Sequence, residues 1–294
     1  MEWRAGPSRT HFFLYTPPLD NKDAVQMGNL RTYLRMARHA EDRVRGALRL
    51  NDSQSKLERD AQEFWTRQPK QQSSFWWHLR GSDPFVDDQL WLDIGKKHVN
   101  MYIDAARMVG FERPVETIVD WGCGGGANAI HFGAECKTLY GIDVSQDALD
   151  ESVKQMQATQ PQCNYVPIKI DVPDPESVLG KIPAGIDMFY CLYVWEVFPS
   201  QAYGQRILEI ARKLLKPGGL GYVQIKYEKD VWTRSRRWGY TRGVANMTRY
   251  RVDQFWELIQ AAGLQPRHLV LIPKPHEVPD FDYAYYFFQK PMDA

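Results

Sequence analysis

One glycine-rich segment, residues 118–129, constrains the fold of this chain more than any other part of the sequence. A short apolar run ends at Asp120 and is followed by three alternate glycines, Gly122, Gly124 and Gly126. Glycine lacks a Cβ and tolerates positive φ, so such a turn can approach a ligand closely. Residues 127–132 then predict a helix whose first amides point at the same place and favour an anionic group. The segment predicts a strand–turn–helix unit that binds a nucleotide-like ligand.

Further apolar runs predict more strands, with helices between them. The runs cover residues 138–142, 165–170, 187–191 and 220–226, and a helix is expected at 203–215. Short apolar strands that alternate with helices predict a parallel sheet covered on both faces. Ligands of such sheets bind outside the carboxyl ends of the strands. Four residues stand at these ends and are expected to meet at one edge: Asp120, Asp143, Asp171 and Cys191.

Asp143 indicates the kind of nucleotide. It follows the first glycines by about 20 residues, where an α/β nucleotide fold holds the ribose hydroxyls. A carboxylate accepts two hydroxyl hydrogen bonds and repels a 2′-phosphate, so the pattern favours an adenosine ligand over an NADP-type one.

The spacing Asp120-x-Gly122-x-Gly124-x-Gly126 differs from the dinucleotide fingerprint G-x-G-x-x-G. It resembles the first motif of the class I S-adenosylmethionine (SAM)-dependent methyltransferases. The later acids come in that family's order, and the turn 216–219 (Lys-Pro-Gly-Gly) before a strand is a further mark of it. The resemblance covers roughly residues 86–290. It implies an α/β, Rossmann-like seven-stranded sheet with the last strand antiparallel, and SAM as cofactor, with S-adenosylhomocysteine (SAH) as product.

The C-terminal part agrees with that fold. A helix is expected at 252–262, capped by Gly263, followed by strands at 268–272 and 283–289. This pair of strands looks like the reversed final hairpin of methyltransferase sheets. The aromatic residues of 283–288 are therefore expected to pack in the sheet.

The resemblance also implies the cofactor contacts. In this family the acid after the third strand, here Asp171, accepts from the adenine amino group, and the next residue, Val172, packs on the ring. The full set of implied cofactor-binding residues is Asp120, Gly122, Cys123, Gly124, Gly126, Asn128, Asp143, Val144, Asp171, Val172, Cys191 and Leu192.

The catalytic group is less clearly marked. Many small-molecule members of the family carry Glu-His after the fourth strand, but this chain has Glu196-Val197. That departure removes the usual histidine base, and a hydroxyl acceptor needs a base or a metal. The residues predicted to act instead are Glu196, His98 and Tyr193. The acids show no metal-ligand pattern.

Two regions outside the core are expected to meet the acceptor. Residues 1–85 predict a helical and aromatic cap before a SAM-binding domain at 86–294, and aromatic residues of 61–92 are expected to fold over the SAM pocket. An insertion at 228–251 interleaves arginines with aromatic side chains, which can bind an acidic, phosphorylated or glycosidic acceptor or form a solvated basic loop. The predicted substrate-binding residues are Trp77, His78, Arg236, Arg237 and Trp238.

Composition indicates which partners and which cellular compartment to expect. The net charge of +1 argues against binding nucleic acid through a strongly basic face. The four cysteines form no C-x-x-C pair, which indicates thiols in a reducing compartment. Neither a signal peptide nor a membrane span is expected, so the sequence predicts a cytoplasmic protein. A helix is expected within residues 30–50, and a homodimer formed through this helix is one possible arrangement.

Together these features predict a SAM-dependent methyltransferase acting on a small-molecule acceptor. The favoured acceptor is a hydroxyl of a sugar, a glycolipid precursor or another secondary metabolite. An N-methyltransferase, a SAM-binding protein that transfers no methyl group and an RNA methyltransferase using the arginines of 228–251 remain open at this stage.

Asp143 gives the first test. Asp143→Ala should weaken SAM binding by about 1.5–3 kcal/mol, because charge-assisted hydrogen bonds to the ribose are lost. Calorimetric titration with SAM and with SAH measures the change. Unchanged affinity would contradict the placement of the ribose.

Overall fold

The computed structural model describes residues 44–45, 51–67, 88–111, 114–229, 235–242, 247–274 and 282–292. The chain divides into two compact units, residues 1–51 and 52–294. Of the first unit, residues 44–45 and residue 51 are described, and residues 44–45 are helical. The rest of the predicted helix at 30–50 lies outside the described residues.

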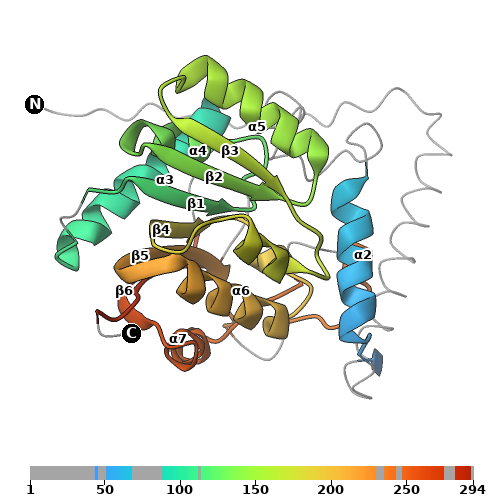
Figure 1. The fold of residues 1–294 in the computed structure, drawn as a ribbon. Helices are drawn as coiled ribbons and strands as arrows, with labels where there is room; N and C mark the ends of the chain where they lie inside the picture. The colour runs from blue at the N-terminus through green and yellow to red at the C-terminus, as the bar shows by residue number, and fades with distance from the viewer. Residues whose placement is uncertain are drawn as a thin grey trace, which may run out of the picture. The chain divides into compact units, whose positions relative to one another are not determined.

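The second unit is built on a seven-stranded sheet with the order β3-β2-β1-β4-β5-β7-β6 (Figure 1). Strands β1 to β5 pair in parallel, whereas β7 runs antiparallel to both of its neighbours. This confirms the predicted sheet and its reversed final hairpin. The strands are β1 (Thr117–Trp121), β2 (Thr138–Asp143), β3 (Asn164–Lys169), β4 (Ile186–Cys191), β5 (Leu215–Lys226), β6 (Gln265–Ile272) and β7 (Tyr283–Gln289).

Helices cover both faces of the sheet. On one face, α6 (Gln201–Leu214) and α7 (Val252–Ala261) bury their apolar stripes in one core cluster. On the other face, α3 (Asp88–Met108) and α4 (Ala129–Phe132) share a second cluster with part of α5 (Gln146–Thr159). None of the described helices combines the length and apolar character that crossing a bilayer requires.

Serine caps begin three of these helices. Ser200 accepts a hydrogen bond from the N–H of Tyr203 at the start of α6, and Ser145 accepts one from Ala148 at the start of α5. Ser53 does the same for Lys56 in α2 (Gln54–Thr66). Such caps satisfy amide groups that a helix leaves unpaired at its first turn.

Helix α2 belongs to the same compact unit as the sheet. Its residues Leu57, Ala61 and Phe64 are buried in the core cluster of α6 and α7. Figure 1 shows α2 beside the carboxyl ends of the central strands. The division between the two units falls at 51/52, and the predicted boundary between a cap and a SAM-binding domain at 85/86 stays a prediction.

Residues 216–219 differ from their prediction as a turn before a strand. They lie inside β5, which begins at Leu215, and the β4–β5 register shifts between Ile186 and Met188. The N–H of Gly218 (φ +74°) donates to the carbonyl of Lys290 at 2.8 Å, and the N–H of Lys290 donates to Gly219 at 3.0 Å. The distant C-terminal partner keeps this segment in the sheet as a bulge.

The start of the helix after the glycine turn also differs. It was predicted at 127–132, but α4 covers only Ala129–Phe132 and continues as the 3₁₀ turn η2 (Gly133–Glu135). The other 3₁₀ turns are η3 (Pro175–Gly180), η4 (Trp195–Val197) and η5 (Tyr240–Arg242).

The aromatic residues of β7 pack as predicted. Tyr283, Tyr285, Tyr286, Phe287 and Phe288 are each at most 3% exposed. The hydroxyl of Tyr286 donates to the carbonyl of Val252 at 2.8 Å, which joins the strand to the first residue of α7.

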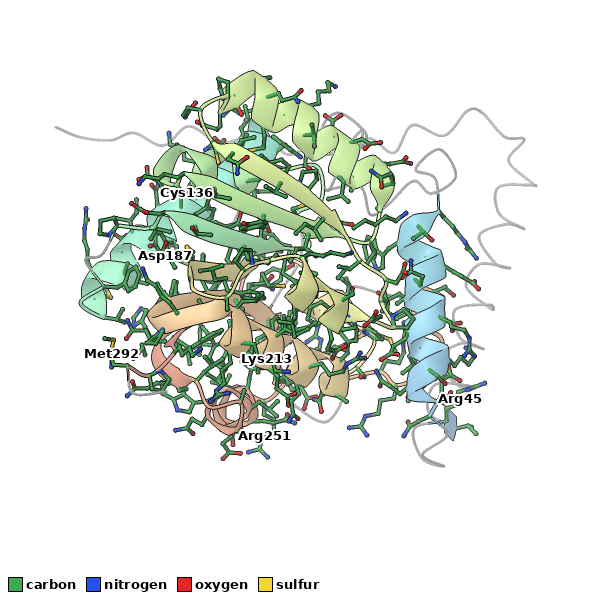
Figure 2. The ribbon with its side chains drawn as sticks, viewed as in Figure 1. Arg45, Cys136, Asp187, Lys213, Arg251 and Met292 are labelled. Carbon is green, nitrogen blue, oxygen red and sulfur yellow. The ribbon has the colours of Figure 1, made fainter. Side chains whose placement is uncertain are left out.

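Asp187 joins three segments at the amino ends of the strands, away from α2 (Figures 1 and 2). It is 4% exposed, accepts hydrogen bonds from the N–H groups of Glu116 (2.9 Å) and Thr117 (2.8 Å), and forms an ion pair with Lys216. One carboxylate thereby connects the starts of β1, β4 and β5.

Asp187→Ala should lower the free energy of unfolding by about 2–4 kcal/mol, because two buried N–H groups lose their acceptor. Urea unfolding measures this loss. Glu209→Ala, on the exposed side of α6, serves as the control and should change the stability by less than about 0.5 kcal/mol. Equal effects of the two substitutions would contradict the role of Asp187.

Candidate functional site

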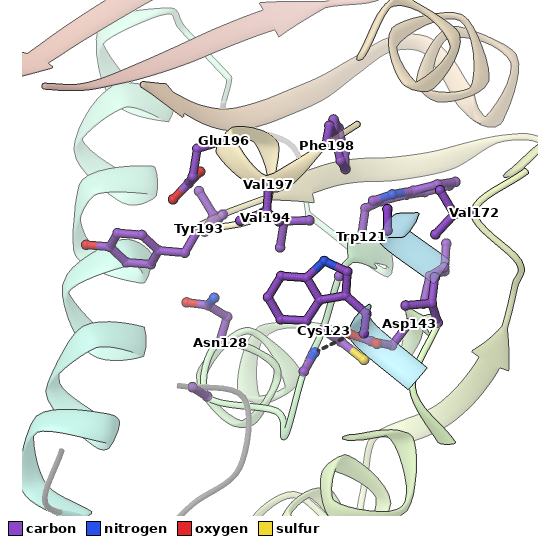
Figure 3. Close-up of a pocket in the computed structure, with 18 of the residues that line it drawn as sticks. Trp121, Cys123, Asn128, Asp143, Val172, Tyr193, Val194, Glu196, Val197 and Phe198 are labelled. Carbon is purple, nitrogen blue, oxygen red and sulfur yellow. Dashed lines mark hydrogen bonds between the residues drawn. The ribbon is translucent and has the colours of Figure 1, made fainter. Parts of the chain in front are cut away.

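A cavity of about 470 Å³ lies at the carboxyl ends of the strands (Figure 3). Its walls come from the glycine turn after β1, the residues that follow β2, β3 and β4, and helices α2 and α3. The cavity lies where the strand order reverses between β1 and β4, which is the usual ligand position in open α/β sheets.

The glycine turn forms the floor of the cavity. Gly122, Gly124 and Gly126 have φ values of +78°, +51° and +93°. A Cβ on Gly122 would lie 2.4 Å from Cγ2 of Val194, and one on Gly126 would lie 3.3 Å from the Cα of Ser152. Glycine at 122 therefore lets the loop after β4 pack on the turn. Glycine at 126 brings the turn close to α5.

Asp143 connects the turn to the end of β2. Its Oδ2 accepts from the N–H of Gly124 at 3.0 Å, and its Oδ1 accepts from the N–H of Ser145 at 2.9 Å (Figure 3). Burial raises the pKa of this carboxyl, and the two N–H groups act in the opposite direction. Because each carboxylate oxygen has two lone pairs, Asp143 can still accept hydrogen bonds from a diol in the cavity.

Five apolar residues at the ends of β2, β3 and β4 contribute to the cavity lining, and we refer to them as the apolar slot: Ile142, Val144, Ile170, Val172 and Leu192. Figure 3 shows Val172 on the same side of the cavity as Asp143. The adenosine part of SAM has a flat, mostly apolar ring and a ribose diol. The apolar slot can pack against such a ring, and the Asp143 carboxylate can accept hydrogen bonds from such a diol. The residues present therefore fit the cofactor.

Of the predicted cofactor contacts, eight line the cavity: Gly122, Cys123, Gly124, Asn128, Asp143, Val144, Val172 and Leu192. The other four are outside its lining: Asp120, Gly126, Asp171 and Cys191.

Asp120 lies under the cavity and is 1% exposed. Its Oδ2 accepts a hydrogen bond from the Tyr190 hydroxyl at 2.8 Å. Burial, together with the charge of Asp143, raises the pKa of Asp120 to about 8, against the lowering effect of the Tyr190 bond. Asp120 therefore supports β1 and β4 from below, and a direct contact with the cofactor stays a prediction.

The predicted catalytic residues gather at the other end of the cavity. Figure 3 shows Glu196, Tyr193 and Asn128 on the side opposite Asp143 and Val172. Glu196 is 4% exposed and lines the cavity from η4. Asn128 also lines the cavity, whereas His98 is not among the lining residues. The two side chains are in contact, with Oδ1 of Asn128 2.7 Å from Nδ1 of His98.

Tyr193 has an unusual backbone conformation. Its φ is +58°, in the left-handed region that favours glycine. Its N–H donates to the Oε1 of the buried Gln224 at 2.6 Å, and its ring packs against His98 (5.1 Å between centroids) and Tyr283 (5.2 Å). Strain of this kind persists only where the surroundings hold it and is common at functional sites.

Three of the predicted substrate residues lie in the insertion. Arg236, Arg237 and Trp238 are outside the lining of the cavity. The carbonyl of Arg237 instead accepts from the N–H of Asp52 at 2.8 Å. The Asp52 side chain accepts from the N–H of Gly239 at 2.9 Å, so the insertion is joined to the residues before α2. Trp77 and His78 lie outside the described residues.

Several lining residues could not be identified from the sequence. They are Ala61, Ile94, Phe198, Tyr203 and Tyr240. Tyr240 is fully buried, accepts from Nε1 of Trp65 at 2.7 Å and donates to the carbonyl of Val197. The interleaved aromatic residues of 228–251 were a signal, but the sequence could not show which of them points inward.

Metal ligation finds no support in the described ranges, which contain no group of three or more His, Cys, Asp or Glu side chains arranged to hold an ion. Methyl transfer from a sulfonium needs no metal when a positioned base or a neutral amine is present.

The sheet order, with its antiparallel β7, and the cavity at the strand ends define a Rossmann-like methyltransferase fold. Residues 119–220 match the family described as "Methyltransferase domain". The match covers about a third of the chain, and the sheet around it has the strand order of Rossmann-like methyltransferases.

Solved structures share the fold at low sequence identity. A SAM-dependent methyltransferase from Methanosarcina mazei is 14% identical with a TM-score of 0.50, over 62% of this chain and 96% of that chain. The N-methyltransferase NodS from Bradyrhizobium japonicum is 17% identical with a TM-score of 0.49, over 70% and 99%. The SAH-bound magnesium protoporphyrin IX methyltransferase from Synechocystis is 13% identical with a TM-score of 0.49, over 70% and 88%. No curated protein matches the sequence.

The raised pKa of Asp120 predicts a pH-dependent stability. Between the ordinary value near 3.8 and about 8, the folded state holds a proton on this carboxyl that the unfolded state has released. The free energy of unfolding should therefore fall as the pH rises through this window. Asp120→Asn should remove that decrease.

Urea unfolding of both proteins at several pH values between 4 and 9 measures the difference. The wild type should lose on the order of a few kcal/mol relative to Asp120→Asn as the pH rises. Parallel pH profiles of the two proteins would show that Asp120 is ionised in the fold.

Proposed function

We propose that this protein is a class I SAM-dependent methyltransferase with SAM as its cofactor and that it acts on a small-molecule acceptor. The proposed acceptor group is a hydroxyl of an uncharged molecule, such as a sugar, a glycolipid precursor or another secondary metabolite. The observation that carries the proposal is the position of Glu196. It is a buried carboxylate in the wall of the cavity, at the end opposite the predicted ribose acceptor Asp143.

The charge of the cavity supports an acceptor without negative charge. Within the described part of the chain, the acidic and basic side chains that line the cavity are Asp143 and Glu196, and both are acidic. Two carboxylates disfavour an anionic acceptor, since like charges repel strongly in a partly desolvated site. This favours a neutral acceptor over the phosphorylated one that the arginines of the insertion first indicated.

The aromatic wall fits an acceptor with apolar faces. Trp65, Tyr240 and Tyr203 line the cavity beside the proposed adenosine slot. Aromatic rings pack well against the apolar faces of sugars and of ring compounds. They also exclude water, which strengthens every polar interaction within the cavity.

The residues of this chain then have distinct tasks. When SAM is bound, it supplies an activated methyl group. Asp143 and the slot around Val172 hold the adenosine part, and the glycine turn holds the polar groups next to it. Glu196 accepts the proton of the acceptor hydroxyl, and Tyr193 positions the acceptor. Holding the two reactants in line provides much of the rate acceleration in such a transfer.

An amine acceptor is the second candidate, and the same observation favours it. A carboxylate in an apolar wall can accept a charge-assisted hydrogen bond from the N–H group of an amine. Only the neutral amine has the lone pair that attacks the methyl group, so the amine would bind after losing its proton to solvent. Glu196 would then orient the acceptor, and the methylated ammonium product would release its proton to solvent.

Glu196→Gln tests the two roles. With a hydroxyl acceptor, found by screening for SAH formation, kcat should fall by about 10²–10⁴-fold while the Kd for SAM stays the same, because general-base catalysis is lost. With an amine acceptor, the main change should be an increase in KM. Glu209→Gln on the exposed side of α6 is the matched control. Full activity of Glu196→Gln would exclude both roles.

A further inference from the structure

The side chain of Gln62, in α2, binds two groups at the end of β3. Its Nε2 donates to Oδ1 of Asp171 at 3.1 Å, and its Oε1 accepts from the backbone N–H of Val172 at 2.6 Å. Gln62 is more than 100 residues from both partners in the sequence, and it contacts them only because α2 packs across the strand ends.

Val172 lines the cavity, and Asp171 stands directly before it. Because Asp171 is predicted to accept from the adenine amino group and Val172 to pack on the ring, we take the Asp171 carboxylate and the Val172 N–H as the polar edge that meets adenine. Adenine offers an N–H donor and a ring-nitrogen acceptor on one carbon. A carboxamide also carries an N–H donor and an acceptor on one carbon. Gln62 therefore presents to Asp171 and Val172 the same donor–acceptor pair as the adenine edge does.

Gln62 and adenine cannot both use this edge. A backbone N–H makes one well-aligned hydrogen bond, and that of Val172 is already used by Gln62. Asp171 has a second oxygen to offer, but Val172 has no second N–H. Adenine can bind the Val172 amide only after the Gln62 side chain has left it.

Only the side chain has to move, because the rest of α2 is held independently. Leu57, Ala61 and Phe64 are buried in the core, and Trp65 is bonded to Tyr240. At the other end of the helix, Glu58 accepts from Arg206 at 3.0 Å. The half-buried Gln62 can rotate away while these contacts stay in place.

We propose that Gln62 occupies the adenine edge of the SAM-free enzyme and is displaced when the cofactor binds, so that it sets the affinity for SAM and SAH. The proposal rests on the placement of adenosine given above. Its physical basis is competition: the apparent affinity of a ligand is reduced by the fraction of the protein in which the site is occupied.

Gln62→Ala tests the proposal. Removing the competitor should make SAH and SAM bind about 3- to 10-fold more tightly, the factor that corresponds to the net strength of one such hydrogen-bonded contact. Isothermal titration calorimetry measures the change without an acceptor or turnover. The matched control is Gln54→Ala in the same helix, whose Nε2 donates to Glu58 at 2.7 Å, and it should leave the affinity for SAH unchanged.

A second measurement observes the contact in the wild type. The side-chain NH₂ signals of ¹⁵N-labelled glutamine are recorded while SAH is added, with Gln62→Ala and Gln54→Ala used for assignment. The Gln62 signal should shift toward that of a solvated amide on saturation, and the Gln54 signal should stay in place.

The outcomes separate the two levels of the proposal. If the wild type binds neither SAM nor SAH, the cofactor site itself is misplaced. If the wild type binds SAH and Gln62→Ala binds it equally or less tightly, the displacement of Gln62 is wrong. An unmoved Gln62 signal in the saturated wild type would also overturn it.

Discussion

The carboxylate of Asp143 is the contact on which the site depends. It accepts from the N–H groups of Gly124 and Ser145 and so joins the glycine turn after β1 to the start of α5 after β2. Both oxygens keep lone pairs for a ligand. The same group that fixes the floor of the cavity is therefore the group proposed to bind the ribose.

The roof of the cavity comes from distant parts of the chain. Helix α2 lies across the strand ends, with Trp65 bonded to Tyr240 and Tyr240 bonded to the carbonyl of Val197. Asp52 connects the same helix to the insertion through Gly239 and Arg237. Because α2 also supplies Gln62, one helix both closes the cavity and occupies the edge where adenine is proposed to bind.

The proposed neutral acceptor rests on the charge of the cavity lining. The sequence placed arginines next to aromatic residues, and that pattern alone favoured an acidic or glycosidic acceptor. In the structure, Arg236 and Arg237 are outside the lining, while Glu196 lies within it. Tyr240 of the insertion does line the cavity, as the aromatic pattern predicted. The charged side chains among the described lining residues, however, are acidic.

The sequence by itself determined the parallel sheet and its reversed hairpin, and it indicated the proposed cofactor. These follow from local patterns: apolar runs, a glycine turn that needs positive φ at Gly122, and acids at strand ends. Only the tertiary structure decided that residues 216–219 stay in β5 and that Asp120 is buried under Tyr190. It also decided that Gln62 binds Asp171 and Val172. The reason is physical: each of these features depends on a partner far away in the chain, and no local preference specifies such a partner.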